Sequence, residues 1–525
     1  MADELTRVAE ESTRGGFYLI TGTASATVIM AIASIIIARL LGPELYGQYT
    51  LSLVTPQLLL LLTDLGVNQG IIKFTAAFIR KNESHRIKRI IKYGLMLRAA
   101  AGTLISLLNY LLADLFATVL LQRPELAVYV KIAAISVLFQ AIFATITSAF
   151  VGLDKTEYNA LASNLQALAK AIISLALVLL GFGVAGAITG HVASYALAAI
   201  PSLTILVLVT RKNKGDSKFE GCRVTSDLKT MLNYGIPLYV SALLTGLIPI
   251  YQNVILAFFT TDVDIGNYKA AVNFTSLMHI VAVPISTALL PAFSKLNSAT
   301  KEEVKIFYRL ANKYTSMMMF PLAFLIIVLA KEIVEIVYGN QYLLAPIFLA
   351  IYCPLYFLVG FGYLVLPSLY NGLGETKTTF KMSLITFITL ILLSPVLAGL
   401  YSVIGLILAY ILANSCGVAY GLHIAKKKFH VEVEGRRILK IFLNSAASSL
   451  PALILLNVAC FSSLITVLLG AGLYMFSYLT LTPLTGAFSK FELEKVKEVV
   501  KKTRFLAAIS KPIIAYQQML IKWQG

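Results

Sequence analysis

Apolar stretches long enough to cross a membrane recur along the whole chain and are separated by short polar segments. A transmembrane helix needs about 20 apolar residues, so this pattern predicts fourteen helices. They lie near residues 16–38, 48–79, 91–112, 125–149, 157–180, 186–209, 235–258, 267–290, 309–330, 343–370, 380–400, 402–424, 441–459 and 463–485. No useful strand-period alternation is found, so helices rather than a closed barrel would satisfy the backbone in hydrocarbon.

Three segments modify this simple pattern. The long second stretch contains Pro56 and Gly66, either of which would bend it. Residues 113–124 resemble an interfacial extension of the third helix. Residues 486–525 alternate lysines with apolar positions near helical spacing, which fits either a basic amphipathic helix on the membrane surface or a solvated tail.

The composition supports a membrane protein. Hydrophobic residues make up 58% and charged residues 13% of the 525 positions, and the mean hydropathy is +0.80. These values exclude a soluble enzyme, a secreted disulfide scaffold and a disordered chain. The four cysteines and five histidines are scattered, which indicates neither a disulfide framework nor a metal site. The N-terminal region lacks a cleavage site, so we expect the first helix to be retained.

The basic residues orient the predicted helices. The formal net charge is +18, with 44 Lys and Arg against 26 Asp and Glu. If the N-terminus is cytoplasmic, 35 of the 44 basic residues fall in the N-terminal tail, in alternate loops and in the C-terminal tail on that same side. This is the positive-inside pattern, and it favours an even helix count, both termini in the cytoplasm and no nucleic-acid partner.

The chain also resembles itself after a shift of 219 residues. Seven of 34 positions in 16–49 match 235–268, including Gly47 with Gly266 and Tyr49 with Tyr268. Two parallel repeats would give two pseudo-symmetric six-helix lobes plus two C-terminal helices, an all-α polytopic fold. The expected parts are an N-terminal lobe at 1–209, a basic cytoplasmic linker at 210–234, a C-terminal lobe at 235–424, two helices at 425–485 and the tail at 486–525.

No catalytic or nucleotide-binding motif is present where it could work, and no loop has room for a catalytic domain. We therefore expect a transporter without cofactor or metal. Ionisable groups within the bilayer are the functional candidates. They are Asp64, Lys73, Arg98, Lys131, Lys170, Lys269 and Lys313.

Depth separates these candidates. Lys131, Lys269 and Lys313 lie near predicted helix ends, where a lysine stem can snorkel to the surface. Lys170 lies near the midplane, so we expect it to face a wet cavity or an acidic partner. Asp64 fits either an ion pair with Lys73 or Arg98 or an ion-coupling carboxylate. The excess of cations suggests a cavity for an anionic group such as a phosphate. His191 and His279 fit satisfied interior or helix-end residues better than ligands.

Short stretches resemble a known family. Residues 38–49 (ARLLGPELYGQY) resemble the first-loop signature of polysaccharide-biosynthesis flippases, and 63–66 (TDLG) resemble their second-helix motif. Residues 264–271 and 290–296 resemble the start and end of their eighth helix. This family is the oligosaccharide-lipid flippase branch of the multidrug/oligosaccharidyl-lipid/polysaccharide exporter (MATE/MOP) superfamily.

The resemblance implies fourteen helices in two bundles, alternating access and export of a polyprenyl-(pyro)phosphate-linked oligosaccharide across the cell membrane. It also implies lobe cations at Arg39, Lys73 and Lys269, to which depth adds Arg98 and Lys170. Arg39 fits equally well as a cap at the outer end of the first helix. The expected partners are the anionic lipid-linked glycan, membrane lipids and glycan assembly enzymes. An ion-coupled multidrug or metabolite antiporter that uses Asp64, and a non-transporting scaffold for glycan assembly, are the alternatives.

Overall fold

The computed structural model describes residues 2–81, 83–212, 224–296, 300–458, 461–488, 493–494, 497, 512 and 514–520. Within these ranges all regular elements are helices. The chain divides into two compact units, Met1–Lys269 and Ala270–Gly525. The predicted amphipathic tail lies mostly outside the described residues and stays a prediction.

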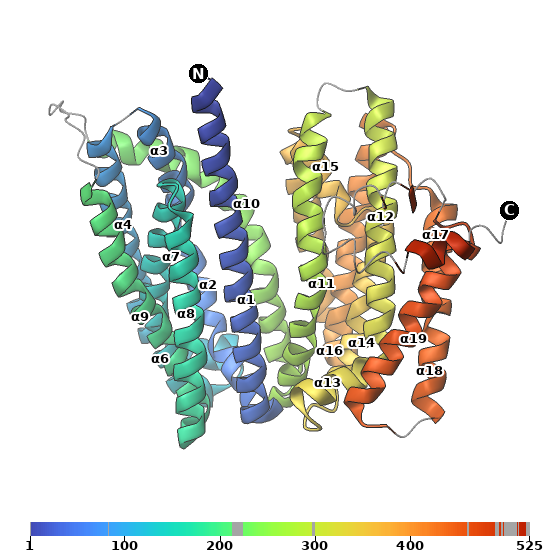
Figure 1. The fold of residues 1–525 in the computed structure, drawn as a ribbon. Coiled ribbons are helices and arrows are strands. Elements are labelled where there is room, and N and C mark those ends of the chain that lie inside the picture. Colours follow the sequence, from blue (N-terminus) through green and yellow to red (C-terminus); the bar gives the residue numbers. More distant parts are fainter. Residues whose placement is uncertain are drawn as a thin grey trace. The chain divides into compact units, whose positions relative to one another are not determined.

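Unit 1 is a bundle built around α1, α8 and α9, with α3, α4 and α7 packed alongside (Figure 1). Its elements are α1 (Ala2–Ser52), α2 (Val54–Leu62), α3 (Val67–Arg80), α4 (Ser84–Leu111), α5 (Ala113–Leu115), η1 (Phe116–Leu120), η2 (Pro124–Leu126), α6 (Ala127–Ala134), α7 (Ser136–Gly152), α8 (Thr156–Leu177), η3 (Val178–Phe182), α9 (Gly183–Lys212) and α10 (Val224–Phe259). The first residues of α11 (Asp262–Lys295) complete this unit.

Unit 2 contains the rest of α11 and the helices that follow it. They are α12 (Lys301–Val328), α13 (Ala330–Tyr338), α14 (Ala345–Tyr352), η4 (Cys353–Phe361), α15 (Val365–Gly372), α16 (Thr376–Phe429), α17 (Gly435–Ala447), α18 (Ser449–Val458) and α19 (Ser463–Leu484). The start of α12 shows how sequence sets a boundary. Thr300 accepts a bond from the backbone N–H of Glu303, whose carboxylate accepts one from Thr300 in return. This capping box satisfies backbone donors that a helix start leaves free.

Ten helices in the described ranges are long and apolar enough to cross a membrane, or eleven if one bent pair counts as a span. Three of the ten are 42, 56 and 54 residues long, namely Thr21–Leu62, Thr156–Arg211 and Thr376–Phe429. Each has room for two crossings at about 20 residues apiece and contains a backbone break, at Gly42, Gly181 and Tyr401–Ser402 respectively. The polytopic all-α fold is confirmed, while the count of fourteen stays a prediction.

Two predicted boundaries can be compared directly. The second stretch breaks at residues 63–66, where Gly66 takes a left-handed φ of 83°, and it is also interrupted at Leu53, three residues before Pro56. Helix α10 begins at Val224, so the last part of the segment expected to be a polar linker is helical. Polar residues can continue a helix beyond the membrane, and hydropathy alone does not detect that extension.

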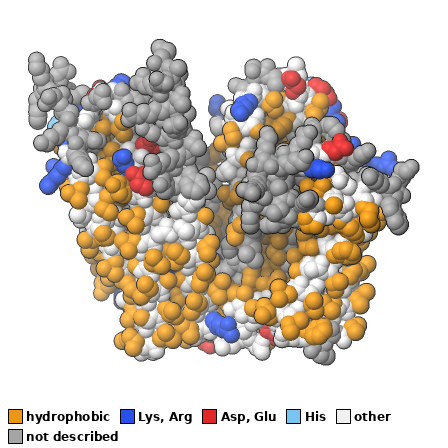
Figure 2. Space-filling model, in the orientation of Figure 1, with side chains coloured by type: hydrophobic (Ala, Val, Ile, Leu, Met, Phe, Trp, Pro, Cys, Tyr) orange, Lys and Arg blue, Asp and Glu red, His pale blue; other side chains and the backbone are white. Residues whose placement is uncertain are grey.

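The surface matches a bilayer environment. In each unit, hydrophobic side chains cover the middle of the visible face, and charged ones gather toward its two ends (Figure 2). Leu179, Leu180 and Val458 are 66%, 72% and 79% exposed. A soluble protein rarely exposes contiguous apolar area on this scale, because contact with water is unfavourable.

Two helical segments that the internal repeat relates to each other, 43–47 of α1 and 262–266 of α11, pack together within unit 1. A Cβ atom added to Gly47 would lie 2.0 Å from the carbonyl oxygen of Asp262. One added to Gly266 would lie 1.8 Å from the carbonyl oxygen of Pro43. The 219-residue shift pairs Gly47 with Gly266 and Pro43 with Asp262, so the contact is reciprocal. Only glycine allows two backbones to approach this closely.

Candidate functional site

Lys170 is the deepest cation of unit 1 that the sequence predicts. It lies in the middle of α8 and is 9% exposed. Its charge acts on the phenols of Tyr46 and Tyr195 and on the imidazole of His191. In the described ranges no ion pair joins Lys170 to a carboxylate. A lysine at this depth therefore has hydroxyl and imidazole neighbours instead of an acidic partner.

Polar side chains from two helices, α1 and α9, lie within electrostatic range of this lysine, namely Tyr46, Tyr195 and His191. Tyr46 comes from α1 and shares a hydrogen bond of 2.8 Å with Ser34. His191 and Tyr195, one turn apart on α9, are in edge-to-face contact with ring centroids 5.3 Å apart. Nε2 of Gln140, from α7, lies 3.5 Å from Nε2 of His191. The other imidazole nitrogen, Nδ1, is buried and has no hydrogen-bond partner among the residues that the structure describes. The cluster thus offers donors and acceptors in a buried place.

Arg98 is in a second polar group at the break between α2 and α3. It is 2% exposed, and its guanidinium donates to the hydroxyls of Thr63 and Thr145, the latter at 3.3 Å. Asp64 is the carboxylate whose charge acts on Arg98, and its Oδ1 accepts a bond of 3.1 Å from the backbone N–H of Asn68. Arg98 therefore holds the chain where it leaves α2, beside a carboxylate of opposite charge.

The other predicted cations have different surroundings. Lys73 is exposed on α3, with Nζ 3.4 Å from the centroid of the Tyr234 ring, a cation–π contact. Arg39 is exposed on α1, three residues before the break at Gly42. Lys269 is half-buried on α11, with Nζ 5.8 Å from the Tyr268 ring centroid. Among the described residues, no hydrogen bond, ion pair or ring contact joins these three to Lys170 or Arg98, so their role in binding stays a proposal.

Two cations outside the predicted site have clear partners. Lys131 pairs with Asp114 at 2.8 Å, and both side chains are partly exposed. Arg123 pairs with Asp262 at 2.9 Å, and both are largely buried. The first pair is a surface contact, as expected for a lysine near a helix end.

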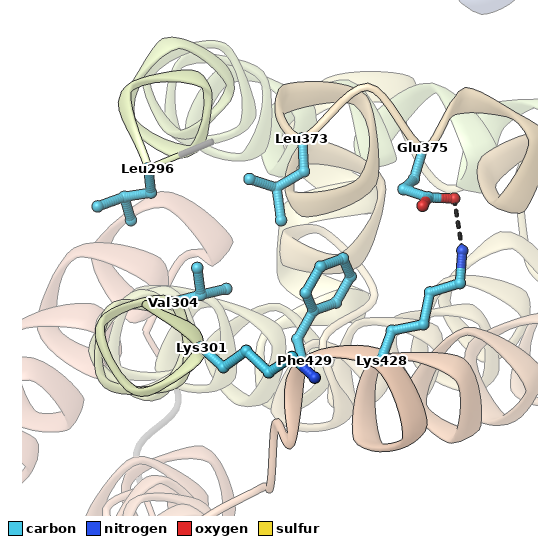
Figure 3. Close-up of a pocket in the computed structure, with 7 residues that line it drawn as sticks. All are labelled: Leu296, Lys301, Val304, Leu373, Glu375, Lys428 and Phe429. Carbon is cyan, nitrogen blue, oxygen red and sulfur yellow. Dashed lines mark hydrogen bonds and ion pairs between the residues drawn. The ribbon is translucent and has the colours of Figure 1, made fainter. Parts of the chain in front are cut away.

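A small cavity of about 250 Å³ lies in unit 2 and holds none of the predicted site residues. Its lining comprises Leu296, Lys301, Val304, Leu373, Glu375, Lys428 and Phe429 (Figure 3). Within it, Lys428 bonds to Glu375 at 2.7 Å. Ligand pockets usually measure about 300–1,000 Å³, so this cavity is small for a large cargo, and one of its two lysines, Lys428, is already paired.

Tyr46, His191, Tyr195 and Gln140 are residues that sequence reasoning did not single out as a group. A search for charge at membrane depth found Lys170 but passes over neutral phenols and amides. One signal was available, because His191 and Tyr195 lie four residues apart and so share a face of one helix. Nothing in the sequence indicated that this face meets Lys170.

The chain resembles solved membrane transporters over most of its length. A structure described as the lipid II flippase MurJ in an inward closed conformation matches with a TM-score of 0.67 and 17% identity, covering 88% of this chain and 98% of that one. An inward-facing multidrug resistance MATE family transporter of the MOP superfamily matches with a TM-score of 0.62 and 15% identity, covering 78% and 98%. A MOP superfamily transporter from Pyrococcus furiosus, described as having a binding pocket of reverse polarity, matches with a TM-score of 0.54 and 18% identity, covering 80% of this chain and 95% of that one.

At these low identities the TM-scores establish a shared fold. A search of curated protein sequences gave no significant match. The family model described as "Polysaccharide biosynthesis protein" matches residues 12–297, more than half of the 525 residues. The match includes Lys170, Arg98 and the turns at Gly47 and Gly266. The chain therefore belongs to the polysaccharide biosynthesis protein family.

Proposed function

We propose that this protein is a flippase that moves a polyprenyl-(pyro)phosphate-linked oligosaccharide across the cell membrane by alternating access. The observation that carries the proposal is the buried Lys170, which has two hydroxyl groups and an imidazole within electrostatic range and no ion-paired carboxylate in the described ranges. An isolated charge in a low-dielectric interior is unfavourable unless a partner of opposite sign arrives. A phosphate group would supply that partner.

The neighbours of Lys170 suit the rest of such a cargo. Tyr46 and Tyr195 present aromatic faces and hydroxyls, and Gln140 and His191 present donors and acceptors suited to sugar hydroxyls. Arg98, Arg39, Lys73 and Lys269 are the further cations that we assign to the path of the head group. The lipid tail would stay in the surrounding bilayer, where the apolar surface of each unit faces hydrocarbon.

The basic loops give the orientation in this proposal. With 35 of 44 basic residues on one side, the positive-inside rule places both termini in the cytoplasm of a cell-membrane protein. The cargo would enter from that side, where glycan assembly enzymes finish it, and leave on the other. The lobes would divide at the segment 210–234, as the repeat predicts.

An ion-coupled multidrug or metabolite antiporter is the second candidate, and the MATE likeness favours it. That function would use Asp64 as its titrating carboxylate. Asp64 instead accepts a backbone bond and lies within electrostatic reach of Arg98, an arrangement that suits a structural counter-ion. We therefore rank the flippase first.

The test replaces Lys170 with Met, which keeps a long unbranched side chain and removes the charge. A charge-assisted bond to phosphate contributes about 1.5–3 kcal/mol, so we expect transport to fall at least about tenfold. Lys170→Arg should retain part of the activity. Lys131→Met, which removes a partly exposed lysine of the same unit, is the matched control and should transport normally.

Two readouts decide the outcome. The first is inward-to-outward movement of a short-chain polyprenyl pyrophosphate carrying one fluorescent sugar, in proteoliposomes of each variant. The second is the amount of lipid-linked glycan that accumulates on the cytoplasmic side of cells. Normal transport by well-folded Lys170→Met would refute the role of the lysine. Drug or metabolite transport that depends on Asp64 and leaves the glycan unaffected would favour the antiporter. Glycan assembly without any transport would favour the scaffold.

A further inference from the structure

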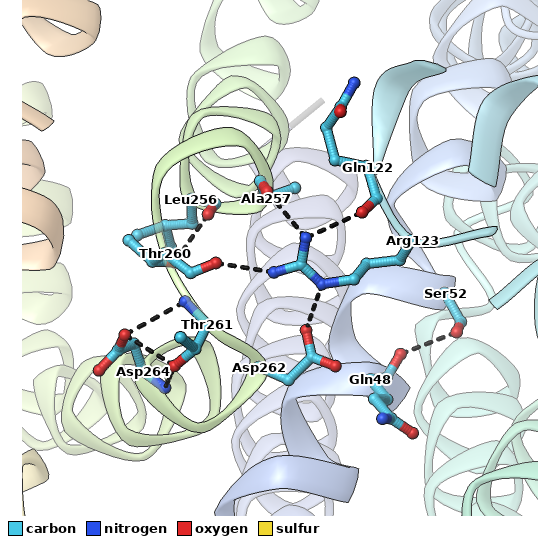
Figure 4. A network of polar contacts seen from close by, with 10 residues as sticks. All are labelled: Gln48, Ser52, Gln122, Arg123, Leu256, Ala257, Thr260, Thr261, Asp262 and Asp264. Atoms are coloured by element: carbon cyan, nitrogen blue, oxygen red, sulfur yellow. Dashed lines mark hydrogen bonds and ion pairs between the residues drawn. The ribbon is translucent and has the colours of Figure 1, made fainter. Parts of the chain in front are cut away.

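Arg123 makes more polar contacts than the cations of the proposed site, although sequence analysis gave it no role. Its guanidinium donates from Nε to Oδ1 of Asp262 at 2.9 Å and from one terminal nitrogen to the carbonyl of Thr260 at 2.7 Å (Figure 4). The other terminal nitrogen donates to the carbonyls of Ala257 at 3.3 Å and Gln122 at 2.9 Å. The side chains of Arg123 and Asp262 are only 19% and 12% exposed.

The chemistry of these partners explains why an arginine fits here. Ala257 and Thr260 lie at the carboxyl end of α10, where carbonyls lack helical partners and the helix dipole is negative. Asp262 is the first residue of α11. A guanidinium has five donors in a planar fork, so one side chain can bind the end of one helix and the start of the next. A lysine could not make all these bonds at once.

The chain around Arg123 is shaped to present it. Gln122 has a left-handed φ of 54°, and the backbone N–H of Arg123 donates to the carbonyl of Ala117 at 2.8 Å. The side chain thus leaves the turn between η1 and η2 and reaches a segment more than 130 residues away in sequence.

The same segment also makes the reciprocal glycine contact. Asp262 provides the carbonyl that Gly47 approaches, and Gly266, one turn further along α11, approaches Pro43. Arg123 therefore binds residues 257–262, next to the point at which the two sequence repeats are in contact. In the proposed topology, the turn after the first helix, the segment 113–124 and the turn at 260–262 all lie on the outer side of the membrane.

We propose that Arg123 is a latch that keeps the outer ends of the two repeats together and has to release Thr260, Ala257 and Asp262 before that side opens. This inference rests on the proposed function, because it assumes the outer location and the lobe division. Arg123 acts as a positioning residue and does not touch the cargo. Its loss should raise the population of the outward-open state instead of weakening cargo binding.

The experiment measures access from outside in the full chain. Cys222, Cys353, Cys416 and Cys460 are first replaced by alanine. A single reporter cysteine is then placed at Ser52 of α1 or at Asn253 of α10, which are 0% and 4% exposed. Ser52 lies five residues, about 7.5 Å of helix, beyond Gly47. Intact cells are treated with a membrane-impermeant maleimide, and the labelling rate is measured.

We expect Arg123→Ala and Asp262→Ala to raise the labelling rate at both reporters at least about tenfold, and Arg123→Lys to give an intermediate rate. Lys131→Ala is the matched control, because it breaks an ion pair in the same unit that does not involve α10 or α11, and it should not change the rate. If Arg123→Ala folds poorly, Arg123→Gln and Asp262→Asn replace the alanine variants.

Unchanged labelling at both reporters in folded Arg123 and Asp262 variants would overturn the latch. Labelling needs no glycan, so this result is separate from the Lys170 test. Increased labelling in the variants, together with an absence of glycan transport by the parent protein, would support the latch and refute the proposed cargo. Glycan transport without any change in labelling would support the cargo and refute the latch.

Discussion

The break between α2 and α3 allows a prediction whose two physical causes can be separated. Gly66 has a φ of 83°, and a Cβ atom added there would lie 2.1 Å from the carbonyl carbon of Gly235 on α10. An alanine at position 66 would have to adopt a left-handed backbone conformation, which lowers the free energy of unfolding by about 1–2 kcal/mol. It also overlaps α10, and overpacking of this kind costs about 1–3 kcal/mol. The sum is about 2–5 kcal/mol.

Two matched variants isolate these causes. Gly181 has a φ of 90° and no atom within 4 Å of an added Cβ, so Gly181→Ala reports the backbone cost alone. Gly235 has no left-handed φ, but its added Cβ would lie 2.1 Å from the carbonyl oxygen of Gly66, so Gly235→Ala reports the overlap alone. Gly66→Ala should therefore destabilise by about the sum of the other two.

The assay is equilibrium unfolding of the purified protein in mixed micelles with increasing SDS, followed by circular dichroism. Each variant is compared with the parent protein at the same lipid content. If Gly66→Ala were no more destabilising than Gly181→Ala, the close approach of α10 to the break would be wrong. If Gly235→Ala were neutral, the same conclusion would follow independently.

Three further predictions use the same unfolding measurement. Arg98→Ala should destabilise by about 2–4 kcal/mol, because two threonine hydroxyls and a nearby carboxylate lose a buried cation, and a cost below about 1 kcal/mol would contradict this burial. Lys73→Met and Tyr234→Leu should be non-additive by about 0.5–1 kcal/mol in a double-mutant cycle, whereas full additivity would exclude the cation–π contact. Tyr370→Phe should cost about 1 kcal/mol by removing its 2.5 Å bond to the carbonyl of Gly421, and a neutral result would show that water replaces it.

Hydropathy predicts the helices of this chain well because bilayer thickness imposes their length. The predicted boundary between residues 400 and 402 coincides with the break at Tyr401–Ser402 inside α16. The same reasoning fails where a helix leaves the bilayer. Val224 begins α10 well before its apolar stretch, because backbone hydrogen bonding continues in polar surroundings where apolar burial does not set the limit.

The candidate site was predictable only in its charged members. Lys170 stands out because a cation near the midplane of an apolar stretch is unfavourable and so demands an explanation. Tyr46 and His191 do not stand out, because neutral polar residues are common in membrane helices and only tertiary packing brings them to Lys170. Arg123 was visible as an unassigned basic residue, but its partners lie more than 130 positions away and no local pattern connects them.

The reciprocal contact of Gly47 and Gly266 has a consequence for the history of the fold. Gly47 contacts Asp262, and Gly266 contacts Pro43. The 219-residue shift relates Gly47 to Gly266 and Pro43 to Asp262, so the two contacts are equivalent. An interface in which the same surface is used twice in this way is isologous, and it closes when two identical copies meet about a two-fold axis. A chain of half the length, with one repeat, would satisfy it by pairing with a second copy of itself. The contact is therefore one that a homodimeric ancestor could already have formed, with the two copies later joined into a single chain.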